Sequence, residues 1–350
     1  MRLLLQKSLL YRYIAPVLKL LIVRFSSIGD IVLTTPVVRC LKQQVQGIEV
    51  HYLTKPQFQS LLTPNPYIDK VYTLGASLKE TAAQLKLENY DGVIDLHNNL
   101  RTLRLKRLLG KPSYAFNKLN WEKWLLVKLK LNRMPDIHIV DRYMETAARF
   151  GVKNDGQGLD YYIPDTEKLD TTSLPNAFGN GYITFAIGGQ HRTKQLPNHK
   201  IVEVLQQLNY PTILIGGKED AKNGEEILKS VSHLSIINRC GQLSLHQSAL
   251  MVQNSKGLIT HDTGMMHIAA ALDIPILSVW GNTVPQLGMY PYYKQGSQAA
   301  LKAEMFEVLG LKCRPCSKIG YDKCPKGHFD CMEKQDSRAI AAKALLLSRE

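Results

Sequence analysis

Long hydrophobic runs are missing from this sequence. No part of its 350 residues is an uncharged apolar stretch of about 18 residues, the length that a membrane-spanning helix needs. Low-complexity tracts and fixed-period repeats are missing as well, which argues against a disordered chain and against a solenoid or propeller. The length suits two ordinary α/β domains, each with its own core.

Negative charge is also scarce. The chain carries 30 Asp and Glu residues against 44 Lys and Arg residues, a formal net charge of +14. This excess favours a polyanionic partner, which can be nucleic acid, anionic lipid or a phosphorylated glycolipid. Because paired C2H2 fingers, an RNP motif and basic-leucine heptads are absent, we expect no nucleic-acid partner.

The N-terminal segment, residues 1–20, is apolar but interrupted by Lys7, Arg12 and Lys19. It has neither a clean apolar h-region nor a small-residue cleavage site, so it does not predict a signal peptide. We expect a helical extension here. The helix either packs on the first domain or lies at a membrane interface with its cations at headgroup level.

Short apolar runs bounded by turn residues alternate with amphipathic stretches. Their continuous Val, Ile and Leu content is typical of parallel strands buried on both faces. The expected strands are residues 20–25, 49–53, 70–74 and 92–96, then 182–186, 212–215, 257–260 and 276–280. The expected helices are residues 31–44, 78–87, 200–208 and 265–272. This alternation predicts the α/β class with doubly wound parallel sheets.

A turn-rich stretch at residues 164–180 divides the two sets of strands and predicts a linker. We therefore expect one Rossmann-like domain at residues 21–163 and another at 181–335, facing each other across a cleft. A terminal helix at residues 336–350 can cross back to the first domain. Ligands of open α/β sheets bind beyond the carboxyl ends of the strands, so the motifs there form the candidate site.

The first motif at a strand end is Ser26-Ser27-Ile28-Gly29-Asp30. Gly29 allows a close backbone approach, and the serines can cap the following helix or bind a ligand. Asp30 has two interpretations. It is either a first-turn carboxylate favoured by the helix dipole, or a general base, since an aspartate is ionised at neutral pH. The spacing matches neither a dinucleotide fingerprint nor a Walker loop.

The second motif runs from His261 to His267 and again joins a strand to a helix. The free N–H groups at a helix N-terminus suit a diphosphate. An aspartic-protease interpretation of Asp262-Thr263-Gly264 fails, because that chemistry needs two carboxylates that share a proton. His267 is either a packed helix residue or a ligand contact.

Together these motifs and the Gly281-Asn282-Thr283 turn resemble glycosyltransferase family 9, which contains the ADP-heptose:lipopolysaccharide heptosyltransferases. The resemblance extends over residues 20–336. It implies the GT-B architecture, with the acceptor in the first domain and the nucleotide sugar in the second. It also implies an inverting transfer of heptose from ADP-heptose to the lipopolysaccharide inner core that needs no metal or cofactor. The enzyme would be cytoplasmic, peripheral at the cytoplasmic face of the inner membrane.

The resemblance also assigns roles to residues. Asp30 matches the catalytic base, and Arg24 would hold an acceptor phosphate or steady Asp30. Lys194 matches a lysine on the donor diphosphate, where it would stabilise the leaving group; by its spacing alone it is equally a solvated loop cation. The other donor-binding candidates are Gly189, Gln190, Glu219, Asp262, Thr263, Gly264 and His267. The other acceptor-binding candidates are Ser26, Ser27, Gly29, His97, Asn98, Asn99, Arg101 and Arg104.

One loop departs from the family pattern. Gly188-Gly189-Gln190-His191-Arg192 replaces the threonine- and acid-containing loop of well-known members. The donor is therefore ADP-heptose or another nucleotide sugar. One alternative is therefore another GT-B nucleotide-sugar enzyme, either a UDP- or GDP-sugar transferase or an epimerase. A second, which rests on the basic charge, is a polyanion-binding protein without enzymatic activity.

A run of basic residues follows the strand at residues 92–96. It is either a solvated helix face or a platform for the carboxylates and phosphates of a Kdo–lipid A acceptor, which arginine pairs with best. Its members are Arg101, Arg104, Lys106, Arg107, Lys118, Lys123, Lys128 and Lys130.

Six cysteines remain to be explained. Cys40 and Cys240 are expected to be ordinary buried thiols. The other four form a compact cluster that also contains His328, and they are structural zinc ligands, reduced packed thiols, or partners in a disulfide or metal cluster. These four are Cys313, Cys316, Cys324 and Cys331.

Overall fold

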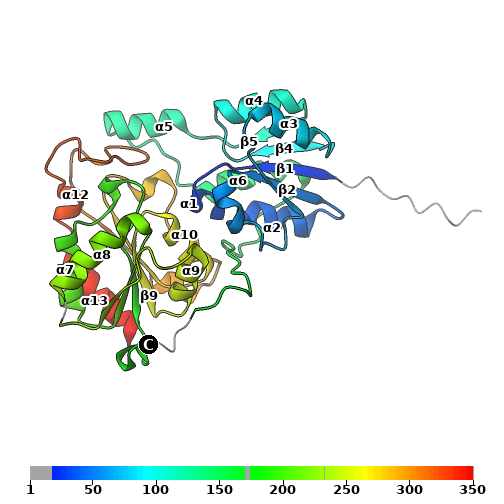
Figure 1. Ribbon diagram of the computed structural model, residues 1–350. Helices are drawn as coiled ribbons and strands as arrows, with labels where there is room; N and C mark the ends of the chain where they lie inside the picture. Colours follow the sequence, from blue (N-terminus) through cyan, green and yellow to red (C-terminus); the bar gives the residue numbers. More distant parts are fainter. Residues whose placement is uncertain (1–17, 170–173, 232, 350) are drawn as a thin grey trace, which may run out of the picture.

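The computed structural model describes residues 18–169, 174–231 and 233–349, which form two α/β domains. The domains lie beside each other (Figure 1). Residues 1–17 of the expected N-terminal helix lie outside the described residues, and β1 (Lys19–Val23) already occupies its last two positions. No helix among the described residues is long and apolar enough to cross a membrane.

The first domain contains a five-stranded, entirely parallel sheet with the order β3-β2-β1-β4-β5. Its central strand β1 is an apolar run that is buried from Leu20 to Val23, as a strand covered on both faces requires. The strands are β1, β2 (Glu49–Thr54), β3 (Lys70–Thr73), β4 (Gly92–Asp95) and β5 (Ser113–Ala115). The helices are α1 (Ile28–Val32), α2 (Thr35–Gln44), η1 (Pro56–Leu61), α3 (Leu78–Lys86), α4 (Leu100–Leu109), α5 (Asn120–Trp124), η2 (Leu125–Leu129), α6 (Ile139–Met144) and η3 (Ala148–Phe150).

The second domain contains a six-stranded parallel sheet with the order β11-β10-β9-β6-β7-β8. Its strands are β6 (Ile183–Ala186), β7 (Thr212–Ile215), β8 (Ile236–Asn238), β9 (Gly257–His261), β10 (Ile276–Trp280) and β11 (Glu304–Glu307). The helices are η4 (Asn176–Phe178), η5 (Arg192–Lys194), α7 (Asn198–Leu208), η6 (Lys218–Asp220), α8 (Ala221–Ser230), α9 (Leu245–Gln253), α10 (Gly264–Ala271), η7 (Pro285–Leu287), α11 (Gln298–Lys302), α12 (Asp330–Glu333) and α13 (Ser337–Ser348).

The terminal helix stays within the second domain. α13 packs against α7, and the Ser337 hydroxyl donates to the Glu203 carboxylate on that helix at 2.9 Å. The expectation that this helix can cross back to the first domain is therefore wrong. Its buried face, from Ile340 to Leu347, belongs to the core of the second sheet.

One expected helix is in fact two. A single helix was predicted over residues 31–44. In the structure α1 ends at Val32 and α2 begins at Thr35. Pro36 lies in the first turn of α2 and has no N–H to donate to the carbonyl of Val32, so the helix cannot run through this position. The break leaves α1 as a single short turn that carries Asp30.

Both sheets reverse their winding direction at a defined place. In the first sheet the chain moves outward from β1 to one side and then returns beside it with β4. In the second sheet the same reversal lies between β6 and β9. Crevices at such switch points are where open α/β sheets bind ligands. The loops after β1, β4, β6 and β9 are those that carry the sequence motifs.

Candidate active site

Asp30 is held by two neighbours at the start of α1. The Arg24 guanidinium lies 2.6 Å from its Oδ1, while the Ser27 hydroxyl and backbone N–H donate to its Oδ2 at 2.9 and 3.1 Å. Asp30 is thus a first-turn helix carboxylate, and 22% of its side chain is still exposed. That exposed part is the route by which a hydroxyl group can reach the carboxylate.

The charge of Asp30 is fixed by opposing effects. Burial alone would raise the pKa of this carboxyl, but the Arg24 cation and the hydrogen bonds from Ser27 outweigh it and lower the pKa below its usual value. Asp30 is therefore an anion at neutral pH. An ionised carboxylate can accept a proton, which is what a general base requires.

Arg24 is fully occupied by the protein. It is buried, and its other donors reach the backbone carbonyls of Ser26 and Leu96 and the Tyr143 hydroxyl, at 2.8, 2.5 and 3.0 Å. Of the two roles expected for Arg24, this geometry supports the one of steadying Asp30. A contact with an acceptor phosphate stays a prediction.

The two motif helices touch each other. A Cβ atom placed on Gly29 in α1 would lie 2.6 Å from Cδ2 of His267 and 3.3 Å from Cα of Gly264, both in α10. A Cβ atom on Gly264 would lie 2.9 Å from the Ile28 side chain. Only glycine at both positions allows α1 and α10 to come this close. The contact brings Asp30 of the first domain next to the helix of the second motif.

A lysine from another loop lies at the N-terminus of α10. Lys194 Nζ lies 2.7 Å from Asp262 Oδ2, and the Thr283 hydroxyl donates to the same oxygen at 2.8 Å. Gly189 lies against this end of the helix, since its Cβ would be 3.1 Å from the Thr263 methyl group. Lysine, a helix N-terminus and a close glycine loop together form a site suited to a diphosphate.

Buried polar atoms without partners lie beside this site. Among the described residues, no group bonds Nδ1 of His267 or either amide atom of Asn282. Both side chains are 2% exposed. Burial lowers the pKa of His267 to about 4, so its ring is neutral at pH 7 and can donate or accept a hydrogen bond. Buried polar groups normally find partners, and a bound ligand would supply them here.

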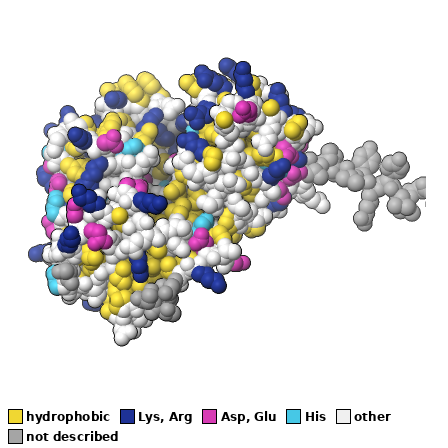
Figure 2. Space-filling view, viewed as in Figure 1, with side chains coloured by type: hydrophobic (Ala, Val, Ile, Leu, Met, Phe, Trp, Pro, Cys, Tyr) yellow, Lys and Arg dark blue, Asp and Glu magenta, His cyan; other side chains and the backbone are white. Residues whose placement is uncertain are grey.

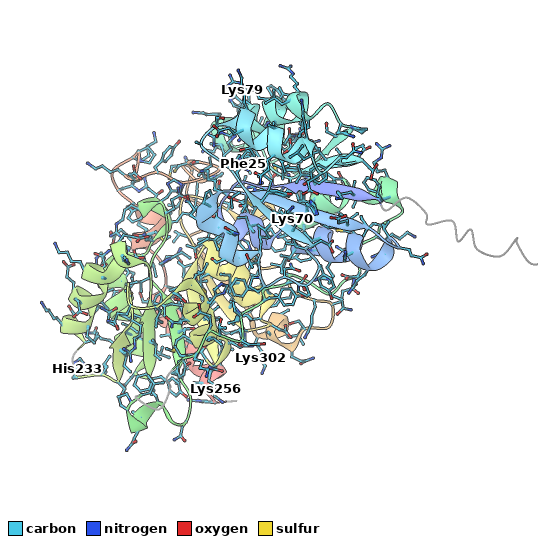
Figure 3. The ribbon with its side chains drawn as sticks, turned by 45° about the vertical axis from the view of Figure 1, so that its right-hand side comes forward. Phe25, Lys70, Lys79, His233, Lys256 and Lys302 are labelled. Atoms are coloured by element: carbon cyan, nitrogen blue, oxygen red, sulfur yellow. The ribbon has the colours of Figure 1, made fainter. Side chains whose placement is uncertain are left out.

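A cavity of about 410 Å³ opens at the switch point of the first sheet. Ser26 lines it after β1, and His97 and Asn99 line it after β4. Lys55 and Arg101 add positive charge to its wall. Phe25, which also lines this cavity, lies at the end of β1 toward the second domain (Figure 3). Four acceptor-binding candidates are therefore brought together in one place: Ser26, His97, Asn99 and Arg101.

Three lysines add to the charge around Asp30. Lys118 Nζ donates to the carbonyls of His97 and Asn98 at 3.2 and 3.1 Å. Burial, with repulsion from Arg142 and then Lys318, lowers the pKa of Lys123 to about 8. Burial, then Arg24 and Lys318, also lower the pKa of Lys118. Among the described residues, no carboxylate contacts Lys123 or Lys318. The cluster therefore favours an anionic ligand. No motif or periodicity in the sequence selects Lys318.

Other candidates lie apart from this centre or serve the protein itself. Asn98 donates from its side chain to the Phe116 carbonyl at 3.0 Å, which shapes the turn after β4. Gln190, Glu219 and Arg104 are exposed on their loops and helix. Next to Glu219, the buried Asp220 accepts from the Gly217 N–H at 2.8 Å. Their expected ligand contacts stay predictions.

The cysteine segment bridges the two domains. Its Arg314 donates to the carbonyls of Gly281 and Thr283, and its Pro315 carbonyl accepts from Lys130 Nζ at 2.6 Å. Cys313 Sγ and His328 Nε2 are 3.8 Å apart. Within the described part of the chain, no three of these thiol and imidazole atoms lie within 4.8 Å of one another, so the ligands do not form a ready tetrahedral site.

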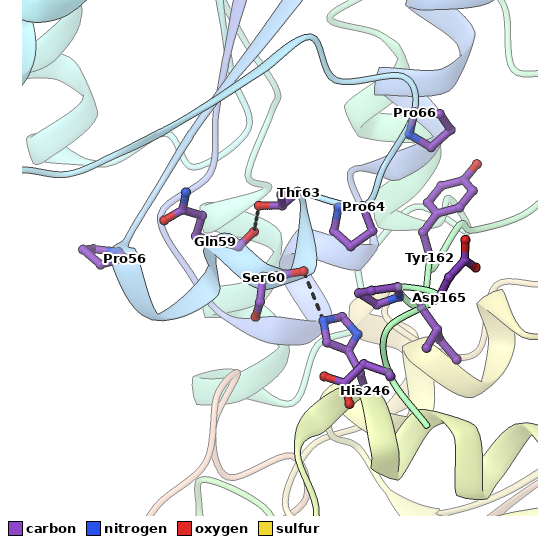
Figure 4. Close-up of a pocket in the computed structure, with 12 residues that line it drawn as sticks. Pro56, Gln59, Ser60, Thr63, Pro64, Pro66, Tyr162, Asp165 and His246 are labelled. Atoms are coloured by element: carbon purple, nitrogen blue, oxygen red, sulfur yellow. Dashed lines mark hydrogen bonds between the residues drawn. The ribbon is translucent and has the colours of Figure 1, made fainter. Parts of the chain in front are cut away.

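The larger cavity, of about 920 Å³, lies elsewhere between the domains (Figure 4). It is formed by η1, the linker and the start of α9, and it contains none of the expected site residues. His246 closes one side: its Nδ1 is 2.9 Å from the Tyr161 hydroxyl and its Nε2 is 3.2 Å from the Ser60 carbonyl. The position of the motifs, not cavity size, therefore identifies the candidate active site.

A family model described as glycosyltransferase family 9 (heptosyltransferase) matches residues 79–309. The chain belongs to this family. It is therefore a glycosyltransferase, and the family that its motifs predicted is confirmed. It is similar to lipopolysaccharide heptosyltransferase 1 of Campylobacter coli, with 23% identity over 76% of this chain and 84% of the relative. It is also similar to lipopolysaccharide heptosyltransferase 2 of Escherichia coli K12, with 22% identity over 77% and 84%.

Solved structures share the architecture. The ADP-heptose lipopolysaccharide heptosyltransferase II of E. coli superposes with a TM-score of 0.70 at 19% identity, covering 95% of this chain and 99% of that one. A glycosyltransferase family 9 protein of Veillonella parvula gives 0.75 at 21% identity, covering 95% and 97%. The predicted GT-B fold of two Rossmann-like domains is confirmed.

Proposed function

We propose that the protein transfers heptose from ADP-heptose to the inner core of lipopolysaccharide by an inverting displacement, with Asp30 as the general base. The observation that carries this proposal is the contact between α1 and α10. In it, the loop of Asp30 in the first domain lies against the helix of the second domain whose N-terminus is next to Lys194 and Asp262, which supports a base on one side and a diphosphate on the other. The heptosyltransferases with similar sequences support the sugar and the acceptor.

The chemistry follows from the positions of the charges. An acceptor hydroxyl in the cavity beside Ser26 gives its proton to Asp30, while its oxygen forms a bond to the anomeric carbon. The bond from that carbon to the diphosphate breaks, and ADP leaves with the electron pair. Lys194 and the N-terminus of α10 stabilise the growing negative charge, which lowers the barrier most where water is excluded.

Acceptor recognition is assigned to the cationic cluster. Lys118 and Lys123 of the first domain and Lys318 of the cysteine segment repel one another, and the two first-domain lysines lie near Asp30. An anionic acceptor relieves that repulsion. The carboxylates of Kdo and the phosphates of lipid A have the required charge, whereas a neutral sugar does not. The protein would meet this acceptor at the cytoplasmic face of the inner membrane.

The test replaces the base without changing its size. Asp30→Asn is expected to reduce kcat by at least about a hundredfold, because proton abstraction is lost while the shape of the loop is kept. The midpoint shift that ADP produces in thermal unfolding should stay close to that of the wild type. Asp136→Asn, a change at an exposed carboxylate of the same domain, is the matched control and should keep full turnover.

A donor panel addresses the loop that departs from the family pattern. ADP-, UDP- and GDP-sugars are offered to the wild-type enzyme with the same acceptor. Turnover with ADP-heptose alone supports the proposal. Turnover with a UDP- or GDP-sugar instead would show that the proposed donor is wrong. Ordinary turnover by Asp30→Asn would show that the proposed base is wrong.

A further inference from the structure

Two tryptophans face solvent on α5. Trp121 is 65% exposed and Trp124 is 45% exposed, whereas Trp280 is 1% exposed. They are three residues apart and therefore lie on the same helix face. Their rings are stacked, with centroids 5.1 Å apart and planes 12° apart. Large aromatic side chains left together in water indicate a docking surface.

The other faces of this helical segment are occupied. Leu126 of η2 packs with Val284 and Leu287 of the second domain. Lys123 faces the other two lysines of the cationic cluster, Lys118 and Lys318. The segment is thus held on two sides by the protein. Within the described residues, nothing covers the side that carries the two tryptophans.

The surroundings of the tryptophans are apolar and basic. Leu129 and Leu131, which follow α5 closely in the chain, are each more than half exposed. Hydrophobic side chains cap the molecule where α5 lies, and Lys and Arg side chains gather beside them over α4 (Figure 2). Residues 99–134 contain a single acid, Glu122. The exposed cations of this region are Arg101, Arg104, Arg107, Lys128, Lys130 and Arg133.

We propose that this face, called here the Trp121/Trp124 surface, docks on an anionic lipid bilayer. Indole rings are favoured at the boundary between headgroups and acyl chains, and lysine and arginine beside them attract anionic lipid. The positive charge of the surface is complementary to an anionic bilayer, whereas a neutral partner would not be attracted by it. This docking element is distinct from the N-terminal segment, for which an interfacial helix was one of two interpretations.

The orientation that results fits the proposed function, on which this inference rests for its acceptor. One side of α5 lies on the bilayer and the other side brings Lys123 toward Asp30. A glycolipid whose acyl chains stay in the membrane can therefore extend its phosphorylated sugars into the cavity between β1 and β4. The enzyme need not extract the lipid.

Vesicle binding tests the surface directly. The purified full-length protein is mixed with vesicles of phosphatidylcholine and phosphatidylglycerol, or of phosphatidylcholine alone, and sedimented. Tryptophan emission is recorded in parallel, and because Trp280 is buried, a blue shift reports Trp121 and Trp124. We expect binding and a blue shift only with the anionic vesicles.

The variants identify the surface. Trp121→Ser/Trp124→Ser should weaken vesicle binding by at least about tenfold, and Arg133→Gln, at an exposed cation of the same region, by about fivefold. Leu301→Ser on α11 changes a side chain that is 76% exposed at the opposite end of the molecule, near the labelled Lys302, and should bind as the wild type does (Figure 3). All three should keep wild-type turnover on a water-soluble, delipidated core oligosaccharide.

Several outcomes would overturn the proposal. These are no binding of the wild type to anionic vesicles, equal binding by the double Trp variant, or a wild-type dimer that the double variant converts to a monomer. Loss of turnover on the soluble acceptor in the double variant would place these residues in the sugar site instead. Vesicle binding is measured without sugar transfer, so it stands or fails separately from the proposed function.

Discussion

The contact between α1 and α10 makes a quantitative prediction for Gly29→Ala. In a free helix this change is stabilising by up to about 1 kcal/mol, because alanine restricts the unfolded chain more than glycine does. Here the new methyl group would lie 2.6 Å from the buried ring of His267 and 3.3 Å from the backbone of α10. Neither neighbour is the end of a flexible side chain, so the two helices must separate.

The two contributions have opposite signs and the clash is the larger. Forcing a methyl group into a packed contact costs about 1–3 kcal/mol, so Gly29→Ala should be destabilising by a net ~1–2 kcal/mol. The effect on catalysis should be greater than the effect on stability. A displacement of about 1 Å between reacting groups can cost a hundredfold in rate, and Asp30 is the next residue in α1.

The assay compares kcat with the urea midpoint for two alanine variants. Gly75→Ala is the matched control, because its Cβ would make an ordinary contact of 3.5 Å with the Thr81 hydroxyl. This control should keep its activity and be neutral or slightly stabilised. Full turnover and an unchanged midpoint for Gly29→Ala would refute the close contact of the two helices.

A double variant identifies the atom responsible. His267→Ala removes the ring that the new methyl group meets, so Gly29→Ala should cost less stability in that background than in the wild type. The expected coupling is about 0.5–3 kcal/mol, as for residues in direct contact. Strict additivity of the two changes in unfolding free energy would show that the ring is not the obstacle.

Three further predictions concern charge and the cysteine segment. Burial lowers the pKa of Lys123 to about 8, so this lysine loses its proton above that pH. The KM for an anionic acceptor should therefore rise above pH 8 in the wild type. It should not rise in Lys123→Arg, which stays charged, and KM measured over a pH series tests both expectations. Burial lowers the pKa of His261 and His267 to about 4. Between about pH 6.5 and 4 these two side chains are therefore protonated in the unfolded chain and neutral in the native state. Stability should therefore fall as the pH falls through that window, and an unchanged urea midpoint would contradict this. A structural zinc in the cysteine segment predicts about one metal equivalent per chain by metal analysis, and less in Cys316→Ser. A metal-free native protein would contradict this and leave reduced thiols or a disulfide, which thiol titration distinguishes.

The sequence predicted the central strands and the edge strand β3, and it missed the other three edge strands, β5, β8 and β11. Central strands such as β1 and β9 are continuous apolar runs, because both of their faces are covered. The edge strand β5, with the sequence Ser-Tyr-Ala, and the edge strand β11 are short and partly exposed, so they carry no such signal. The break between α1 and α2 was missed. Pro36 was the residue that indicated it, because proline is typical of the first turn of a helix.

The site was predictable as two halves but not as a whole. Asp30 and Asp262 were found because each follows a buried strand and begins a helix. Lys318 was not found, since it lies in a loop without periodicity and far in sequence from the residues that it faces. Contacts between distant segments depend on how two domains pack, which local patterns do not encode.

The direction from which the acceptor enters follows from the same contact. With α1 against α10, the donor half of the proposed site lies on the second-domain side of Asp30, and the cavity lined by His97 and Asn99 opens at Ser26 on the first-domain side. This cavity adjoins α4, whose first turn supplies Arg101. We therefore expect the acceptor to arrive past α4, whose exposed cations lie on the same part of the chain as α5 and its exposed tryptophans. Active-site packing and surface composition lead independently to the same side of the protein.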